Sequence, residues 1–151
     1  MRRTAGAGAA LGVALLLALS GCSGPGEDEL IAQAKAEFDA LVEDAAAVEL
    51  DVLHTLEVED PVSTSCDEES DAEHTVFVAA GTMAVQSTPG DEAGLIKLLK
   101  PEPPVDDEAE GWTEIDGLPS GERAYLSPEG ITVAVSARQG LLVITVFSPC
   151  R

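Results

Sequence analysis

The first long pattern in the chain is a stripe of apolar residues between Glu27 and about Leu53. Its members recur every three or four positions, as on one face of a helix: Leu30, Ala34, Phe38, Leu41, Ala45, Val48 and Val52. The acidic residues 27–29 match the positive end of a helix dipole. Such a stripe forms either a coiled-coil seam or a face packed on a sheet. We favour the sheet, because strands follow and the stripe is short for a coiled coil.

After this helix the pattern changes to one of turns and short strands. Residues 57–73 are acidic and rich in turn formers, so we interpret them as a connector that contains Cys66. The β-branched and aromatic residues at 74–80 predict a strand. Gly81 is typical of a β-bulge, and the strand is expected to continue through residues 83–85.

A second helix is predicted from about residue 88. The segment 88–91, Thr-Pro-Gly-Asp, offers a capping threonine, a proline for the first helical position and an aspartate for the dipole. Apolar residues within 95–99 supply its buried face. Lys97 and Lys100 suit the negative end of the helix, and Pro101 ends it.

The last third of the chain reads as a β-meander, with strands at 112–115, 123–126, 131–137 and 141–147 separated by turns. The final strand is apolar on both faces, which predicts a central or doubly covered position. The whole pattern predicts an α+β fold in which an antiparallel sheet of four to five strands carries two helices on one face, as a two-layer sandwich.

The N-terminal segment has the features of a targeting peptide. Arg2 and Arg3 precede an apolar run over residues 9–19, which is shorter than the roughly 20 apolar residues of a membrane span. Small residues then lead into Cys22, in the order Leu19, Ser20, Gly21. This arrangement resembles the lipobox of bacterial lipoproteins. An ordinary secretory peptide with an incidental cysteine is the alternative.

The resemblance implies a division of the chain into three parts. Residues 1–21 are the signal peptide, which is cut off, and the Cys22 thiol takes a diacylglycerol. Residues 22–29 form a lipidated tether, and residues 30–151 form a single α+β domain, since the length leaves little room for two domains.

The charge of the chain restricts its partners. The 151 residues include 28 acidic and 8 basic side chains, a net charge of −20. Phosphates need a basic face, so we expect no binding to nucleic acid. Loss of Arg2 and Arg3 with the signal peptide makes the net charge −22. An anionic membrane surface repels such a chain, so acyl chains on Cys22 must provide the attachment.

Two cysteines remain beyond the tether, Cys66 and Cys150. An even pair in an exported chain predicts a disulfide, which would close a loop of about 85 residues and stabilise the fold by roughly 4–5 kcal/mol. Two buried free thiols are the alternative. We expect no metal at these cysteines, because they form no C-x-x-C pair and no histidine has ligand spacing to them.

The chain also resembles a family of small cell-envelope lipoproteins of actinobacteria. The residues that carry this resemblance are the lipobox, the pair Gly111-Trp112 before the last strands, and the C-terminal Ser148-Pro149-Cys150. The resemblance implies a lipid-anchored location on the extracytoplasmic face of the cell membrane, with no established chemistry.

Catalytic signals are weak. The two histidines, His54 and His74, lie in no recognised motif, and we place His54 at the end of the first helix. The acidic stretches 67–73 and 106–110 lack a calcium-loop pattern and read as solvated segments. Trp112 and Tyr125 could form a stacking surface, although core filling is the interpretation we favour.

These observations favour a non-catalytic binding or interaction module without a cofactor. It would take an envelope protein, a peptide or a small ligand on its sheet or on the segment 101–110. The alternatives are an envelope hydrolase and a protein that binds cations at its acidic loops. A hydrolase would need a histidine or a carboxylate pair in a deep cleft.

Overall fold

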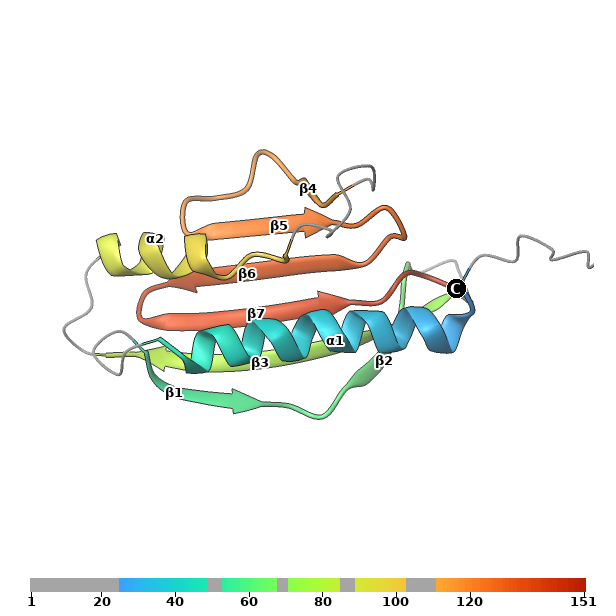
Figure 1. Cartoon of the computed structure of the whole chain (residues 1–151), viewed down its shortest axis with the longest axis horizontal. Helices are drawn as coiled ribbons and strands as arrows, with labels where there is room; N and C mark the ends of the chain where they lie inside the picture. Colours follow the sequence, from blue (N-terminus) through green and yellow to red (C-terminus); the bar gives the residue numbers. More distant parts are fainter. Residues whose placement is uncertain (1–24, 49–52, 68–70, 85–88, 103–110) are drawn as a thin grey trace, which may run out of the picture.

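The computed structural model of the chain describes residues 25–48, 53–67, 71–84, 89–102 and 111–151. These ranges contain two helices, α1 (Glu27–Ala46) and α2 (Pro89–Leu98), and one antiparallel sheet of seven strands (Figure 1). The predicted α+β class and antiparallel sheet are confirmed, but the sheet has more strands than the four to five expected. The strands are β1 (Leu53–Val58), β2 (Val62–Ser65), β3 (Glu73–Met83), β4 (Thr113–Glu114), β5 (Glu122–Leu126), β6 (Thr132–Arg138) and β7 (Leu141–Phe147).

Helix α1 uses the predicted apolar stripe but ends earlier than its spacing indicated. Its buried side chains are Leu30, Ala34, Phe38, Leu41 and Ala45. The helix begins inside the expected tether 22–29, with the acidic residues 27–29 in its first turn. It ends at Ala46, and residues 49–52 lie outside the described ranges. Leu53 then opens a strand, because pairing with β3 outweighs the helical spacing of the last apolar positions.

The expected connector over residues 57–73 was wrong in part, because this stretch contains the end of β1, the whole of β2 and the first residue of β3. Strands β1 and β2 pair with successive halves of β3 and form a broken edge to the sheet. Pro61 lies at the break, where no ladder bond to its nitrogen is needed. The acidic side chains of this stretch made it look like a loop, but charges are also common on edge strands, where they discourage unwanted pairing.

Strand β7 is central, as predicted, and it lies between β3 and β6. The order across the sheet is β1-β3-β7-β6-β5-β4, with β2 paired to β3. The predicted meander of β4 to β7 is therefore confirmed. Leu142, Ile144 and Val146 of β7 are fully buried, whereas the alternating residues on the other face are only half-buried.

The irregularity expected at Gly81 lies on the neighbouring strand instead. The register between β1 and β3 shifts between Leu53 and Thr55, while β3 and β7 pair without interruption through Gly81. The glycine is needed for a different reason. A Cβ at this position would lie 2.5 Å from the carbonyl oxygen of Thr55, so the two backbones approach too closely for a side chain.

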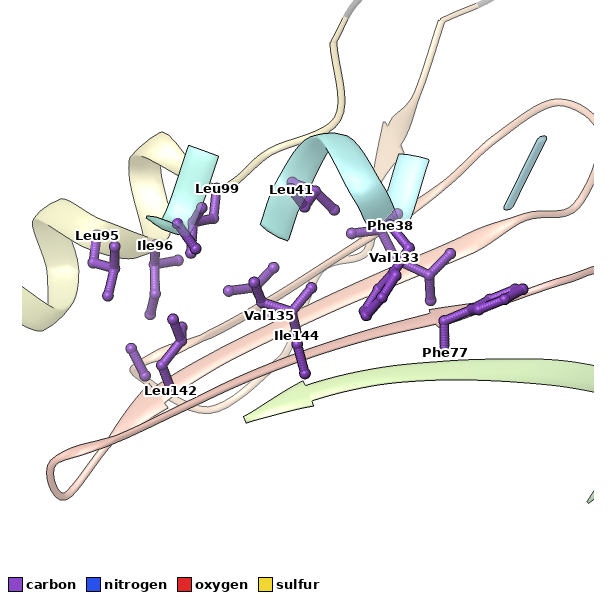
Figure 2. Close-up of a cluster of buried hydrophobic side chains, with 14 of the residues drawn as sticks. Phe38, Leu41, Phe77, Leu95, Ile96, Leu99, Val133, Val135, Leu142 and Ile144 are labelled. Atoms are coloured by element: carbon purple, nitrogen blue, oxygen red, sulfur yellow. The ribbon is translucent and has the colours of Figure 1, made fainter. Parts of the chain in front are cut away.

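The core is one cluster that draws on both helices and on alternating positions of the strands (Figure 2). Phe38 of α1 packs on Phe77 of β3, with ring centroids 5.8 Å apart. In Figure 1, α1 lies along β7 and β3, and α2 lies by β6, in agreement with the contacts between these elements. Figure 2 shows side chains of both helices close to those of β6 and β7: Leu95, Ile96, Leu99, Leu41, Val133, Val135, Leu142 and Ile144.

Candidate functional site

A cavity of about 540 Å³ opens beside the end of α2, next to strands β4 and β5. We call it the aromatic–basic groove. Its lining combines three basic side chains, one acidic side chain and two aromatic rings. The lining residues are Lys97, Lys100, Pro101, Gly111, Trp112, Glu114, Arg123 and Tyr125.

Regular secondary structure positions half of these side chains. Arg123 and Tyr125 are two positions apart on β5, so they project from the same face of the sheet. Glu114 of β4 lies directly opposite Tyr125 in the strand register. Lys97 lies in the last turn of α2, whereas Lys100 follows the end of that helix and Trp112 immediately precedes β4.

The charge of the groove is opposite to that of the chain as a whole. A second cavity, of about 530 Å³, shares Lys97, Glu114 and Arg123 with the groove and adds Arg138, but its lining also includes the acidic residues Glu92, Asp116 and Glu122. Four of the six basic residues of segment 22–151 therefore line these two neighbouring cavities. Arg123 donates a hydrogen bond to Glu114 at the groove. Among the described residues, no carboxylate forms an ion pair with Lys97 or Lys100.

The two aromatic residues of the groove have structural roles as well. Tyr125 is 8% exposed and belongs to the core cluster, and Trp112 is half-buried and packs against that cluster. Core filling was the expected role, and the structure adds that both residues line the groove. Rings held by a core need little further ordering when a ligand stacks on them.

A second cluster of reactive side chains lies around the two cysteines. Cys66 and Cys150 are at disulfide distance, with Cα atoms 6.0 Å apart, within the range that a disulfide requires. The Nδ1 atom of His74 lies 3.6 Å from the sulfur of each cysteine. We expected no metal at the cysteines because no histidine has ligand spacing to them along the sequence. In the folded structure, however, His74 lies next to both sulfurs. Pairing of β2 with β3 brings residue 74 beside residue 66, and the C-terminal segment pairs with the start of β3. This hairpin pairing is the signal in the sequence that could have found the cluster.

The other residues singled out from the sequence are not brought together. His54 is an exposed residue of β1 and not the end of a helix. Glu73 belongs to β3 and accepts a hydrogen bond from the Ser63 hydroxyl, so it is not part of a loop. Residues 68–70 and 103–110 lie outside the described ranges, as do residues 1–24, which include the predicted signal peptide and Cys22.

Among the described carboxyl groups, Glu37 has a perturbed acidity. Burial raises the pKa of Glu37 above its ordinary value, and the negative charge of Glu102 raises it further. The side chain of Glu37 is half-buried. Within the described ranges, the polar residues classed as buried are Ser127 and Ser148, and no carboxylate is among them.

Comparison with known proteins adds no relative. No family model matches the chain, and neither curated proteins nor solved structures contain a significant match. Neither helix of the described ranges has the length and the continuous apolar character needed to cross a bilayer.

Proposed function

We propose that the protein is a lipid-anchored module of the cell envelope that binds an anionic ligand without catalysis. The observation that carries this proposal is the aromatic–basic groove, which gathers three basic side chains and two rings in a chain of net charge −20. Nearby charges act more strongly than distant, screened ones. A groove with more basic than acidic side chains therefore attracts anions, even though the net charge of the chain is negative.

The ligand class follows from the lining of the groove. Ammonium and guanidinium groups donate strong hydrogen bonds to carboxylate or phosphate oxygens. Trp112, which is half-buried, offers part of its ring to a flat or ring-shaped ligand portion beside that anion, whereas Tyr125 is 8% exposed and adds little surface. We therefore assign the groove to a ligand that joins a negative group to a ring, such as an acidic or phosphorylated sugar.

The proposed architecture places both helices on one face of the sheet, as a two-layer sandwich. Support comes from the core cluster, which joins side chains of α1 and α2 to Val133 and Ile144, residues that project from the same face by register. This layering would hold the end of α2, with Lys97 and Lys100, over the edge of β5 and so form one wall of the groove.

The anchor is proposed at Cys22, with residues 1–21 removed. Helix α1 begins at Glu27, so only a few residues would separate the acyl chains from the folded domain. The first turn of α1 lies beside Ser148, Pro149 and Arg151, with which it lines a small cavity. The disulfide end of the domain would therefore face the membrane. Replacing Cys22 by Ser should release the protein or leave an unprocessed precursor, and a processed, unacylated variant that stays on the membrane would contradict the anchor.

Absence of catalysis is part of the proposal. Among the described lining residues of the groove, the carboxylate of Glu114 is already engaged by Arg123, and no histidine or cysteine is present. A hydrolase needs a nucleophile with a base, or two carboxyl groups of different polarity. The lining of the groove therefore fits ligand binding better than either of these two hydrolytic mechanisms.

Fluorescence of Trp112, the chain's single tryptophan, reports binding directly. We expect glucose 6-phosphate to change the emission saturably, with inorganic phosphate and glucose each binding more weakly. Lys100→Ala should weaken binding by about threefold to tenfold, because one charge-assisted contact is lost. Lys35→Ala is the matched control. It also removes a lysine, but Lys35 pairs with Asp39 on α1 and lines neither of the two cavities. A flat titration, or equal effects of the two lysine variants, would disprove the ligand assignment.

A further inference from the structure

We propose that the cluster of Cys66, Cys150 and His74 is a zinc-type metal site that opens when the disulfide is reduced. The proposal is independent of the groove and of its ligand. In the oxidised protein the sulfurs carry no negative charge and are bonded to each other, so they cannot act as thiolate ligands. In this oxidised structure the two sulfurs and the imidazole nitrogen lie within 4.8 Å of one another, and reduction would turn the sulfurs into two thiols beside that imidazole.

The distances around His74 match a tetrahedral zinc site. With Zn–S bonds of about 2.3 Å and a Zn–N bond of about 2.0–2.1 Å, tetrahedral angles put the nitrogen roughly 3.6 Å from each sulfur. The Nδ1 atom of His74 is 3.6 Å from the sulfur of Cys66 and 3.6 Å from that of Cys150. The imidazole is therefore already placed for the metal, and only the two sulfurs need to separate, to about 3.8 Å in the same geometry.

Backbone pairing holds the three residues in place without the disulfide. The Cys66 amide donates to the carbonyl of Ala72, which closes the β2–β3 hairpin next to His74. On the other side, Glu73 and Arg151 exchange two backbone hydrogen bonds, which dock the residues flanking Cys150. These bonds keep the ligand-bearing segments together after the sulfur–sulfur bond is broken.

A ring contact orients the histidine. The imidazole of His74 meets the ring of Phe147 edge-on, with centroids 5.3 Å apart and planes at 71°. A fixed ring lowers the entropy lost when the nitrogen binds a metal. Two soft sulfur ligands and one imidazole favour Zn²⁺ over Ca²⁺ or Mg²⁺, which prefer oxygen. Water can take the fourth position, as in zinc sites with three protein ligands.

A dithiol can reduce the Cys66–Cys150 disulfide in a balanced exchange reaction. The dithiol gives two electrons and two protons to the disulfide and becomes a disulfide itself, so two thiols form on the protein. Binding of Zn²⁺ then releases one proton from each thiol, because the metal binds the thiolate form.

Cobalt titration of the reduced protein tests the site. The chain carrying Cys22→Ser, so that Cys66 and Cys150 are the remaining cysteines, is reduced on an immobilised dithiol resin and titrated with Co²⁺ without oxygen. We expect one equivalent to bind with a thiolate-to-cobalt charge-transfer absorption and to be displaced by Zn²⁺. The oxidised protein should show no such absorption. His74→Ala should weaken binding by at least about tenfold, whereas His54→Ala, which alters an exposed histidine of β1, should not.

Near-ultraviolet circular dichroism of Trp112 covers the case in which reduction unfolds the domain. In that case we expect Zn²⁺ to restore the native signal, since metal binding then contributes to folding. The proposal is overturned by a reduced protein that shows no charge-transfer absorption, by an unfolded reduced protein that Zn²⁺ does not refold, or by equal cobalt affinities with and without His74.

Discussion

The backbone of Gly81 approaches that of Thr55 so closely that a Cβ on the glycine would lie 2.5 Å from the Thr55 carbonyl oxygen and 2.9 Å from a methyl group of Leu53. This contact joins β3 to β1 at the point where the β1 register shifts. A side chain at residue 81 would force the edge strand away from the sheet, because the obstructing atom is backbone and cannot rotate aside.

Gly81→Ala is therefore expected to destabilise the fold by about 1–3 kcal/mol, as overpacking does in a well-packed interior. Urea unfolding measures the change. Gly94→Ala is the matched control, because a Cβ on this residue of α2 meets nothing within 4 Å. It should stabilise the protein by about 0.5–1 kcal/mol, since alanine is the better helix former. Equal effects of the two substitutions would contradict the close approach.

The turn between β6 and β7 contains a strained residue, Gln139, and a substitution can relieve this strain. Gln139 has φ of 55° and Gly140 has φ of 76°, so both central residues of this two-residue hairpin are left-handed. Such turns favour asparagine before glycine. Gln139→Asn should raise the free energy of unfolding by about 0.5–1 kcal/mol, part of the cost of a left-handed residue. Thermal unfolding checks it, and Gln139→Val, with a β-branched side chain, should have the opposite sign.

Loss of the Cys66–Cys150 link should reduce stability strongly. The two residues are 84 positions apart, so the link restricts a long segment of the unfolded chain. We expect Cys66→Ser combined with Cys150→Ser to cost about 2–5 kcal/mol in denaturant unfolding without reductant. Cys22→Ser should leave stability unchanged, because Cys22 precedes α1. Mass spectrometry that finds two free thiols at residues 66 and 150 in protein isolated without reductant would refute the link.

Glu37 should make stability depend on pH in the direction opposite to an ordinary ion-paired carboxylate. Burial and the charge of Glu102 raise the pKa of Glu37 in the folded state above the ordinary 4.5, so the folded state holds this proton to higher pH than the unfolded chain does. Its contribution to stability is present below that pH and is lost as pH rises through the folded pKa.

Glu37→Gln should therefore stabilise the protein at neutral pH, with an advantage that fades as the pH falls below 4.5, the ordinary pKa of the carboxyl. Thermal unfolding at several pH values measures this. Glu43→Gln makes the same charge change at an exposed position of the same helix, so it corrects for the general effect of lowering the net charge. Equal pH profiles for the two variants would count against the raised pKa.

The pattern of apolar and polar residues correctly predicted the elements that bury one face along their length. The alternation of Val133 and Val135 in β6, and the apolar run of β7, predicted strands that are present, because a central strand must place apolar residues against the core. The edge strands β1 and β2 were missed, since an edge residue needs no apolar partner and tolerates charge. The end of α1 was missed for a related reason: helical spacing continued past Ala46, but Ala47 caps the helix and the chain pairs with β3 from Leu53.

The sequence by itself determined the α+β class, the meander, the amphipathic helix and the expectation of a cysteine pair, because each depends on neighbouring residues or on counting. Only the tertiary structure decided which distant side chains meet. It brought Lys97 beside Trp112 and Arg123 to form the groove, and it placed His74 beside the paired Cys66 and Cys150. The order of strands in the sheet sets these contacts, since pairing β7 with β3 carries the C-terminus back to residue 74 and no local spacing encodes that return.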